Sequence, residues 1–223
     1  MVARISSEPR PSTGLEQALA VAQFAPGDVF ELAAIVKGHG RSRLAARRFV
    51  VGAGSGAEDW IHERAREQAK LGPGACEGGI YLGLNPLISA EGGRAKDCDV
   101  RAVRMLLIDV DPVDASPAAR AAAADMANEI RALLRARLDV APALIDSGRG
   151  RQLWLAHEPM APDDESWRAT RAGVLAGLAR RFDRELAKVD VKTFNASRLA
   201  RLPGTVNLRT REHACRLCAA ERT

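Results

Sequence analysis

Apolar and polar positions alternate along the chain with two different periods, which predicts a mixture of strands and helices. Short apolar runs bounded by turn residues are typical of strands, and such runs occur at 30–36, 48–51, 80–84, 103–110, 143–146 and 152–156. Apolar positions that recur every three or four residues indicate helices, and this spacing occurs at 58–70, from Ser116 to about Asp139, and from Asp163 or Asp164 to Phe182. Strand and helix signals that interleave in this way favour a mixed α/β or α+β class.

The strongest strand signal, at 103–110, leads into a pair of acidic residues. Its nearly continuous apolar run is expected for a strand covered on both faces. Successive side chains of a strand point to opposite faces, so Asp109 and Asp111 share a face, roughly 6–7 Å apart along the chain. Carboxylates at the end of a buried strand repel each other, and a divalent cation such as Mg²⁺ relieves this. A solvated acidic turn, with Asp114 nearby, is the alternative interpretation.

A glycine-rich turn joins the two strands of the predicted hairpin. It reads Ser147-Gly148-Arg149-Gly150. Its glycines permit a tight turn with exposed backbone N–H groups, and those donors, with Arg149 and Arg151, could cradle a triphosphate. An ordinary glycine-rich hairpin turn is the alternative.

The stretch 189–208 holds a third group of candidate residues. Asp190 is a candidate third metal ligand, and Lys192, Arg198 and Arg201 are candidates for phosphate contacts. Pro203-Gly204 would form a turn that directs Arg201. A surface loop with a structural Pro-Gly turn is the alternative.

The net charge of the 223-residue chain is +5, with 33 Lys and Arg against 28 Asp and Glu, and most of the basic residues are Arg. Arginine binds phosphate through a planar fork, so this composition suits nucleic acid or nucleotides, although a codon bias would give the same excess. The basic stretch with Arg41, Arg43, Arg47 and Arg48 could follow a template backbone. An ordinary solvated basic face explains it equally well.

Two further features bear on location and metal content. No stretch approaches the ~20 apolar residues of a membrane span, and residues 1–14 lack the apolar centre of a signal peptide, so we expect a cytoplasmic protein. The sequence His213-x-Cys215-x-x-Cys218 could be half of a zinc site, but a structural zinc needs four ligands and no second pair follows.

The acidic pair, the glycine-rich turn and the later aspartate, in this order, resemble the motifs of the archaeo-eukaryotic primase superfamily. The resemblance is to the primase-polymerases of phages, plasmids and related mobile elements, and it covers roughly residues 28–210. Their D-x-D or D-x-E motif is matched by Asp109 and Asp111, and their third motif by Asp190. The S-G-x-G-x-H-like second motif is matched at Ser147, Gly148 and Gly150, with Gln152 in place of the histidine.

Two other segments add to the resemblance. The stretch Arg198 to Asn207 is similar to the R-x-x-R-x-P-G-T-x-N segment of the mobile-element branch, and residues 80–86, which include Asn85, look like its YxxLNP strand. The fold that the resemblance implies is α+β, with an RRM-like antiparallel sheet as catalytic core and a smaller N-terminal α/β unit. The expected divisions are a flexible lead-in at 1–19, a catalytic domain at 20–215 made of units 20–85 and 86–215, and a tail at 216–223.

The resemblance implies template-directed nucleotidyl transfer, as a DNA primase, a DNA polymerase or both. Two Mg²⁺ or Mn²⁺ ions would be held by Asp109, Asp111 and Asp190. NTPs or dNTPs would contact Ser147, Gly148, Arg149, Gly150, Gln152, Lys192, Arg198 and Arg201. Single-stranded DNA template and primer would contact Arg41, Arg43, Arg47, Arg48 and Asn85. A replicative helicase, as a further domain or a separate protein, is another expected class of partner.

Three alternative functions share single features with this sequence. A Toprim enzyme needs a glutamate followed by a full strand–helix unit before D-x-D, and Glu91 lies too close to Asp109 for that. A replication-initiator nickase needs paired histidines, but the four histidines are scattered and Tyr81 is the only tyrosine. A catalytically silent nucleic-acid-binding module of the same fold remains the main rival. Gln152 would suit it, whereas clustered carboxylates would serve it poorly.

Overall fold

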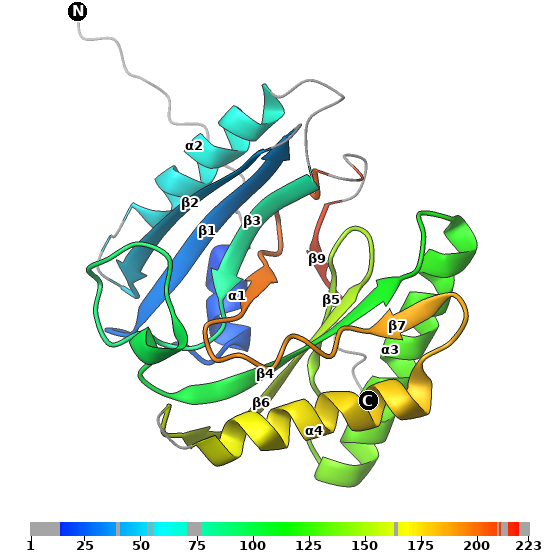
Figure 1. The fold of residues 1–223 in the computed structure, drawn as a ribbon. Coiled ribbons are helices and arrows are strands. Elements are labelled where there is room, and N and C mark those ends of the chain that lie inside the picture. The colour runs from blue at the N-terminus through cyan, green and yellow to red at the C-terminus, as the bar shows by residue number, and fades with distance from the viewer. Residues whose placement is uncertain are drawn as a thin grey trace, which may run out of the picture.

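The computed structural model describes residues 14–38, 41–52, 54, 56–70, 77–162, 165–208, 210 and 214–218. Within these residues the chain forms two antiparallel sheets and four α-helices (Figure 1). This confirms the predicted mixture of helices with antiparallel strands. No described helix has the length and apolar character that crossing a membrane requires.

The first sheet has the strand order β2-β1-β3-β8. Its strands are β1 (Val29–Gly38), β2 (Arg41–Val50), β3 (Glu77–Gly83) and β8 (Leu199–Arg201), and its helices are α1 (Leu15–Val21) and α2 (Ala57–Ala69). Helix α2 packs on this sheet through aromatic contacts, because the Trp60 ring meets Phe49 edge-on at 6.1 Å and Phe49 lies 5.7 Å from Phe30. These rings form part of one buried core with α1.

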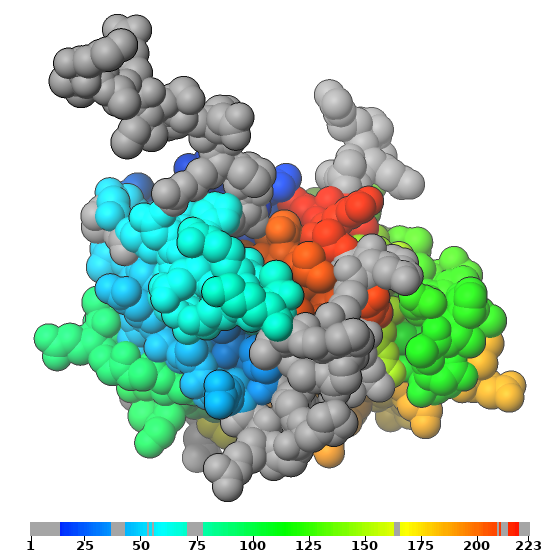
Figure 2. All heavy atoms as spheres, turned by 90° about the horizontal axis from the view of Figure 1, so that it is seen from above, coloured from blue at the N-terminus to red at the C-terminus, as the bar shows by residue number. Residues whose placement is uncertain are grey.

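The first sheet is not confined to the expected unit 20–85. Strand β8 comes from the far end of the chain, and pairs with β3 through Tyr81 and Arg201. Helix α1 begins at Leu15, inside the expected lead-in 1–19. At the other end, Arg216–Leu217 of the expected tail pairs as strand β9 with the second sheet. Figure 2 shows the orange and red C-terminal residues between the blue and cyan residues of the N-terminal part, which include helix α2, and the green residues of the second part.

The second sheet has the order β7-β4-β6-β5-β9. Its strands are β4 (Val103–Pro112), β5 (Ala143–Asp146), β6 (Arg151–Met160), β7 (Ala187–Val189) and β9 (Arg216–Leu217), and its helices are α3 (Pro117–Leu138) and α4 (Glu165–Phe182). The chain order β4-α3-β5-β6-α4-β7, with strands arranged β7-β4-β6-β5, is that of a ferredoxin-like β-α-β-β-α-β unit. Helix α3 begins as the sequence predicts, since the Ser116 hydroxyl accepts a hydrogen bond from the Ala119 N–H and Pro117 is the first helical residue.

Strand β4 is buried on both faces, which explains its continuous apolar sequence. Ile108 and Val110 belong to the core beneath α3 and α4, whereas Met105 and Leu107 belong to the core shared with the first sheet. Each such side chain contributes about 1.5–3 kcal/mol by burial. Because faces alternate along a strand, Asp109 continues the Met105 and Leu107 side and therefore points toward the first sheet.

Candidate functional site

A cavity of about 490 Å³ lies between the two sheets. Its walls bring together these residues singled out in the sequence: Asp109, Asp111, Ser147, Arg149, Gln152, Asp190, Arg198 and Arg201. Ile35 and Leu44, which are paired across β1 and β2, line it from the first sheet. The cavity therefore joins carboxylates, guanidinium groups and an apolar wall.

The three aspartates come from neighbouring positions of the second sheet. Asp109 and Asp111 lie on β4, and Asp190 directly follows β7, which is paired with β4. The Asp190 N–H donates to the Asp109 carbonyl at 2.8 Å. The buried Thr193 hydroxyl donates to the Leu107 carbonyl at 2.9 Å, so the loop after β7 is fixed against β4 and holds Asp190 beside the pair.

The charges of Asp111 and Asp190 raise the proton affinity of Asp109. The pKa of Asp109 is raised to about 7, first because the group is buried and then because of the charge of Asp111, with Asp190 adding to it. The charge of Arg198 and a hydrogen bond from Gln152 oppose this shift. Arg198 Nη2 also lies 3.2 Å from Asp190 Oδ2 in an ion pair. The cavity wall thus brings three carboxylates together beside the guanidinium groups of Arg94, Arg149, Arg198 and Arg201.

Carboxylate oxygens in this setting fit a hard divalent cation. Mg²⁺ and Mn²⁺ prefer such ligands, and the raised pKa of Asp109 marks a place where positive charge would be stabilising. Among the described residues, however, no three His, Cys, Asp or Glu side chains gather as a metal-binding group. Asp190 instead pairs with Arg198, and its Oδ1 accepts the Lys192 N–H at 2.9 Å. Asp109 and Asp111 are therefore the ligand pair that the cavity offers most directly.

The turn between β5 and β6 has a different role from the expected backbone cradle for a triphosphate. The Ser147 N–H donates to the Gly150 carbonyl, the Gly148 N–H to Asp146 Oδ1, and the Gly150 N–H to the Ser147 hydroxyl. These three donors are used within the turn, whereas the Arg149 side chain lines the cavity. Gly148 has φ of +82°, and a Cβ on Gly150 would lie 2.4 Å from the Val110 carbonyl oxygen. Both glycines are thus required by the shape of the turn.

Gln152 and Arg201 join the two sheets beneath the cavity. Gln152 Oε1 accepts the Arg201 N–H at 3.1 Å, while the same side chain is hydrogen-bonded to Asp109. The Arg201 guanidinium donates to the Gly78 carbonyl at 2.7 Å and to the Tyr81 hydroxyl at 2.9 Å, and lies 4.6 Å above the Tyr81 ring. Both Gln152 and Arg201 are buried. Their contacts within the protein fix the position of Asp109 relative to β8.

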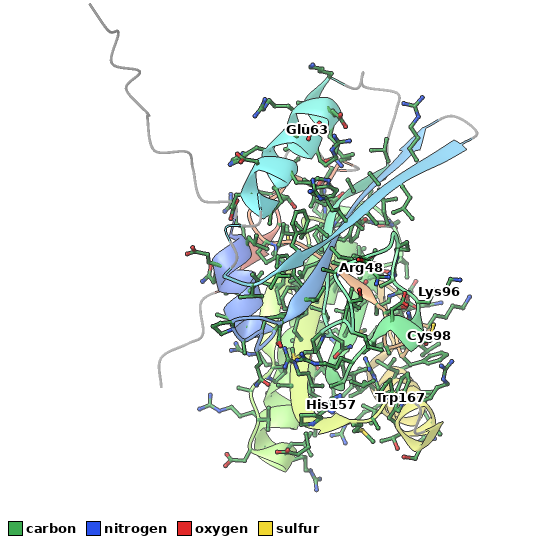
Figure 3. All side chains as sticks on the ribbon, turned by 90° about the vertical axis from the view of Figure 1, so that its left-hand side faces the viewer. Arg48, Glu63, Lys96, Cys98, His157 and Trp167 are labelled. Atoms are coloured by element: carbon green, nitrogen blue, oxygen red, sulfur yellow. The ribbon has the colours of Figure 1, made fainter. Side chains whose placement is uncertain are left out.

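Other residues singled out from the sequence lie away from the cavity. The Arg48 side chain is only 6% exposed; it pairs with Asp99 at 2.7 Å and donates to the carbonyls of Ser89 and Gly93. Figure 3 shows Arg48 on the side of the loop that carries Lys96 and Cys98. The guanidinium therefore anchors this loop.

Asn85 likewise makes contacts inside the protein. Its Oδ1 accepts the N–H groups of Arg104 and Met105, and its Nδ2 donates to the Ala196 carbonyl at 2.9 Å. It is 2% exposed, so these contacts fix the start of β4 and leave it out of reach of a nucleic acid.

The remaining basic candidates are exposed or lie outside the description. Arg43 and Arg47 are exposed on β2, an edge strand, and Lys192 is exposed beside the cavity without lining it. The Arg41 side chain and all of His213 lie outside the described residues. Cys215 of the suggested zinc half-site is 1% exposed, and burial raises the pKa of its thiol to about 12.

Sequence reasoning missed several residues that line the cavity. Arg94 donates to the buried Glu31 carboxylate at 2.7 Å and to the Ser197 carbonyl at 2.7 Å. Arg94 lies in a polar segment without a recognisable motif, so its position in the cavity wall becomes evident only from the fold. Tyr81 and Asn207 also line the cavity, and both lie inside the segments that carried the family resemblance.

Comparisons with known proteins show a weak likeness to a solved structure. No protein-family model and no curated protein matches the sequence. Among solved structures, the chain is similar to the polymerase domain of ligase D from Mycobacterium tuberculosis in complex with DNA, with a TM-score of 0.46 and 14% identity over 86% of this chain and 72% of that one. A likeness of this degree establishes neither a shared family nor a shared activity.

Proposed function

We propose that the cavity catalyses template-directed nucleotidyl transfer, as a DNA primase or DNA polymerase of the mobile-element type. One observation supports this most strongly: the paired carboxylates of Asp109 and Asp111 share a single cavity with the guanidinium groups of Arg149 and Arg198. Carboxylates that hold a cation, set close to groups that neutralise phosphates, are what phosphoryl and nucleotidyl transfer require.

Asp109 and Asp111 would hold Mg²⁺ or Mn²⁺, with Asp190 as the third ligand. When bound, the cations lower the pKa of an attacking hydroxyl and stabilise charge on the phosphates of the incoming nucleotide. Asp190 is held by Arg198 through an ion pair whose side chains are 29% and 34% exposed, respectively. Because exposed pairs of this kind contribute little, typically about 0–1 kcal/mol, exchange of Arg198 for a cation costs little.

The other side chains would bind and orient the substrates. Arg149 and Arg198, which line the cavity, would contact the triphosphate of an NTP or dNTP. Gln152 would act on Asp109, through the hydrogen bond that holds its carboxylate, rather than on the phosphates. Leu44, which is 50% exposed, and Ile35 offer an apolar surface for the sugar or base. Exposed Arg43 and Arg47 on β2 would meet the single-stranded template or primer.

A catalytically silent nucleic-acid-binding module is the second candidate. It is favoured by the pairing of Asp190 with Arg198 and by the lack of a ready group of three metal ligands among the described side chains. The clustered carboxylates of Asp109, Asp111 and Asp190 argue against it, because without a cation between them they would repel the phosphates of a nucleic acid.

The test is nucleotide incorporation on a single-stranded template, with and without a primer, in the presence of Mg²⁺ or Mn²⁺. We expect product with the wild type and none with the Asp109→Asn/Asp111→Asn variant. Asp125→Asn, an exposed aspartate on α3, is the matched control and should keep full activity. Absence of product from the wild type with either metal, while single-strand binding is intact, would favour the silent module.

A further inference from the structure

A second cavity, of about 380 Å³, lies on the other side of the turn between β5 and β6. Its walls include Arg120 of α3, Arg149 of the turn and Arg151 of β6. One carboxylate, that of Asp146, lines it as well. Three guanidinium groups against one carboxylate leave two positive charges in excess in this cavity.

The strand register places this cavity on the opposite face of the second sheet from the aspartates. Asp109 is paired with Gln152, and Val110 with Arg151. Because side chains alternate between faces, Arg151 points to the side of Val110, which packs beneath α3 and α4. Arg149, at the tip of the turn, lines both cavities.

The guanidinium groups differ in how far they are already engaged. Arg151 pairs with Asp146 at 3.0 Å and donates to the Gly150 carbonyl. Within the described residues, by contrast, no ion pair joins Arg120 or Arg149, and the buried Arg149 Nε–H has no hydrogen-bond partner. The nearby exposed Asp114 is hydrogen-bonded to Ser116. These hydrogen bonds are the main cause of its lowered pKa, and the charge of Arg149 contributes less to that shift. Two guanidinium groups thus remain able to bind an anion.

The start of α3 adds to the positive potential. Pro117, its first residue, lines the same cavity, and the N-terminus of this 22-residue helix carries roughly half a positive charge. The planar fork of an arginine matches the oxygens of a phosphate group and can bind two of them at once.

We propose that Arg120, Arg149 and Arg151 form a phosphate-binding site next to the carboxylate cavity, which takes a phosphate of the same ligand that reaches the aspartates. The choice of a phosphate-bearing ligand rests on the proposed function. The phosphate belongs either to the backbone of a single strand that passes over the turn or to the triphosphate of a nucleotide. Arg149 connects the two cavities in both cases.

Binding measured without divalent cations tests this site apart from catalysis. The probes are a fluorescein-labelled oligodeoxythymidylate and a mant-labelled deoxynucleoside triphosphate, each titrated by fluorescence in EDTA at several salt concentrations. The variant is Arg120→Gln, because Arg120 lines only the second cavity. Arg137→Gln, an exposed arginine at the opposite end of α3, is the matched control. Circular dichroism and the thermal midpoint check that each variant is folded.

We expect Arg120→Gln to weaken one of the two probes by about three- to tenfold, Arg120→Lys to restore part of the loss, and Arg137→Gln to have no such effect. Weaker binding of the oligonucleotide, with a slope of log K against log salt concentration that is smaller in magnitude by about 0.7, assigns the site to the strand backbone. Weakening of the nucleotide assigns it to the triphosphate. Unchanged binding of both probes, or an equal loss in Arg137→Gln, would overturn the site. A loss with Arg120→Gln in a protein that incorporates no nucleotide would leave this site standing and reject the proposed function.

Discussion

Asp109 and Gln152 face each other across the β4–β6 ladder, and the Gln152 side chain is hydrogen-bonded to the Asp109 carboxylate. The other end of Gln152 accepts the N–H of Arg201 in the first sheet. One amide thus stabilises the charged form of an aspartate and links it to the opposite wall of the cavity. In the family that the sequence resembles, a histidine expected to contact phosphates occupies this position, whereas here the side chain is engaged within the protein.

The Gln152→Glu variant tests this link. A glutamate can still accept the Arg201 N–H, but it replaces the donor to Asp109 by a second negative charge. We expect the pKa of Asp109 to rise further above about 7 and incorporation at pH 7 to fall by about tenfold or more. The measurement is the pH–rate profile, whose rising limb should move to higher pH. If the Gln152→Glu variant and the wild type had the same pH–rate profile, Gln152 would not act through Asp109.

Stability without a metal ion should depend on pH through Asp109. Its pKa is about 7 in the folded chain and has the ordinary value of 3.8 when unfolded. The folded state therefore binds more protons between these values, and stability falls as pH rises from about 4 to about 7 and then levels off. Asp109→Asn removes this term, so it should raise the thermal midpoint at pH 7.5 relative to wild type and have much less effect at pH 4. Calorimetry in EDTA measures both, and a midpoint lowered at pH 7.5 would contradict the account.

Divalent cations should stabilise the protein more at pH 7.5 than at pH 5. Binding requires the deprotonated carboxylates, and a ligand present at 100 times its Kd stabilises the folded state by about 2.7 kcal/mol. We expect Mn²⁺ to raise the thermal midpoint of wild type and of the Asp125→Asn control, but not that of the Asp109→Asn/Asp111→Asn variant. Equal shifts in all three proteins would place the cation elsewhere.

Arg201 should prove more important for stability than for phosphate binding. Arg201→Ala removes the guanidinium donor to the Gly78 carbonyl and to the Tyr81 hydroxyl, together with the contact with the Tyr81 ring. We expect a loss of about 2–4 kcal/mol in the free energy of unfolding. Tyr81→Phe keeps the ring and loses only the hydroxyl, so it should cost about 0.5–1.5 kcal/mol. Urea unfolding measures both. An Arg201→Ala variant with wild-type stability and a large loss of nucleotide affinity would reverse this assignment.

The most accurate predictions concern segments in which the spacing of apolar residues determines the direction of each side chain. The continuous apolar run at 103–110 predicted a doubly covered strand, and period two placed Asp109 and Asp111 on one face; both lie in one cavity of the structure. Helix α3 was predicted from its Ser-Pro start and apolar stripe, because these signals are local. The function of the aspartates in catalysis stays a prediction.

The rest depended on partners that are distant in sequence. Strand β2 begins at Arg41, although only 48–51 was expected, because an edge strand can be half exposed and is held by backbone pairing with β1. The three-residue strand β8 has no signal of its own and forms because β3 offers a free edge. The sequence predicts that Arg48 contacts a template strand or lies on a solvated basic face, yet Asp99, from a segment about 50 residues away, binds it.

Single-nucleotide incorporation directed by the template base tests the central claim most directly. Four primed templates that differ only in the first unpaired base are each incubated with the four nucleotides separately, in Mg²⁺ or Mn²⁺. We predict that the wild type and Asp125→Asn add the complementary nucleotide in every case, and that Asp109→Asn/Asp111→Asn adds none. Addition that ignores the template base, addition that survives loss of both aspartates, or no addition by the folded, DNA-binding wild type would each contradict template-directed nucleotidyl transfer at this cavity.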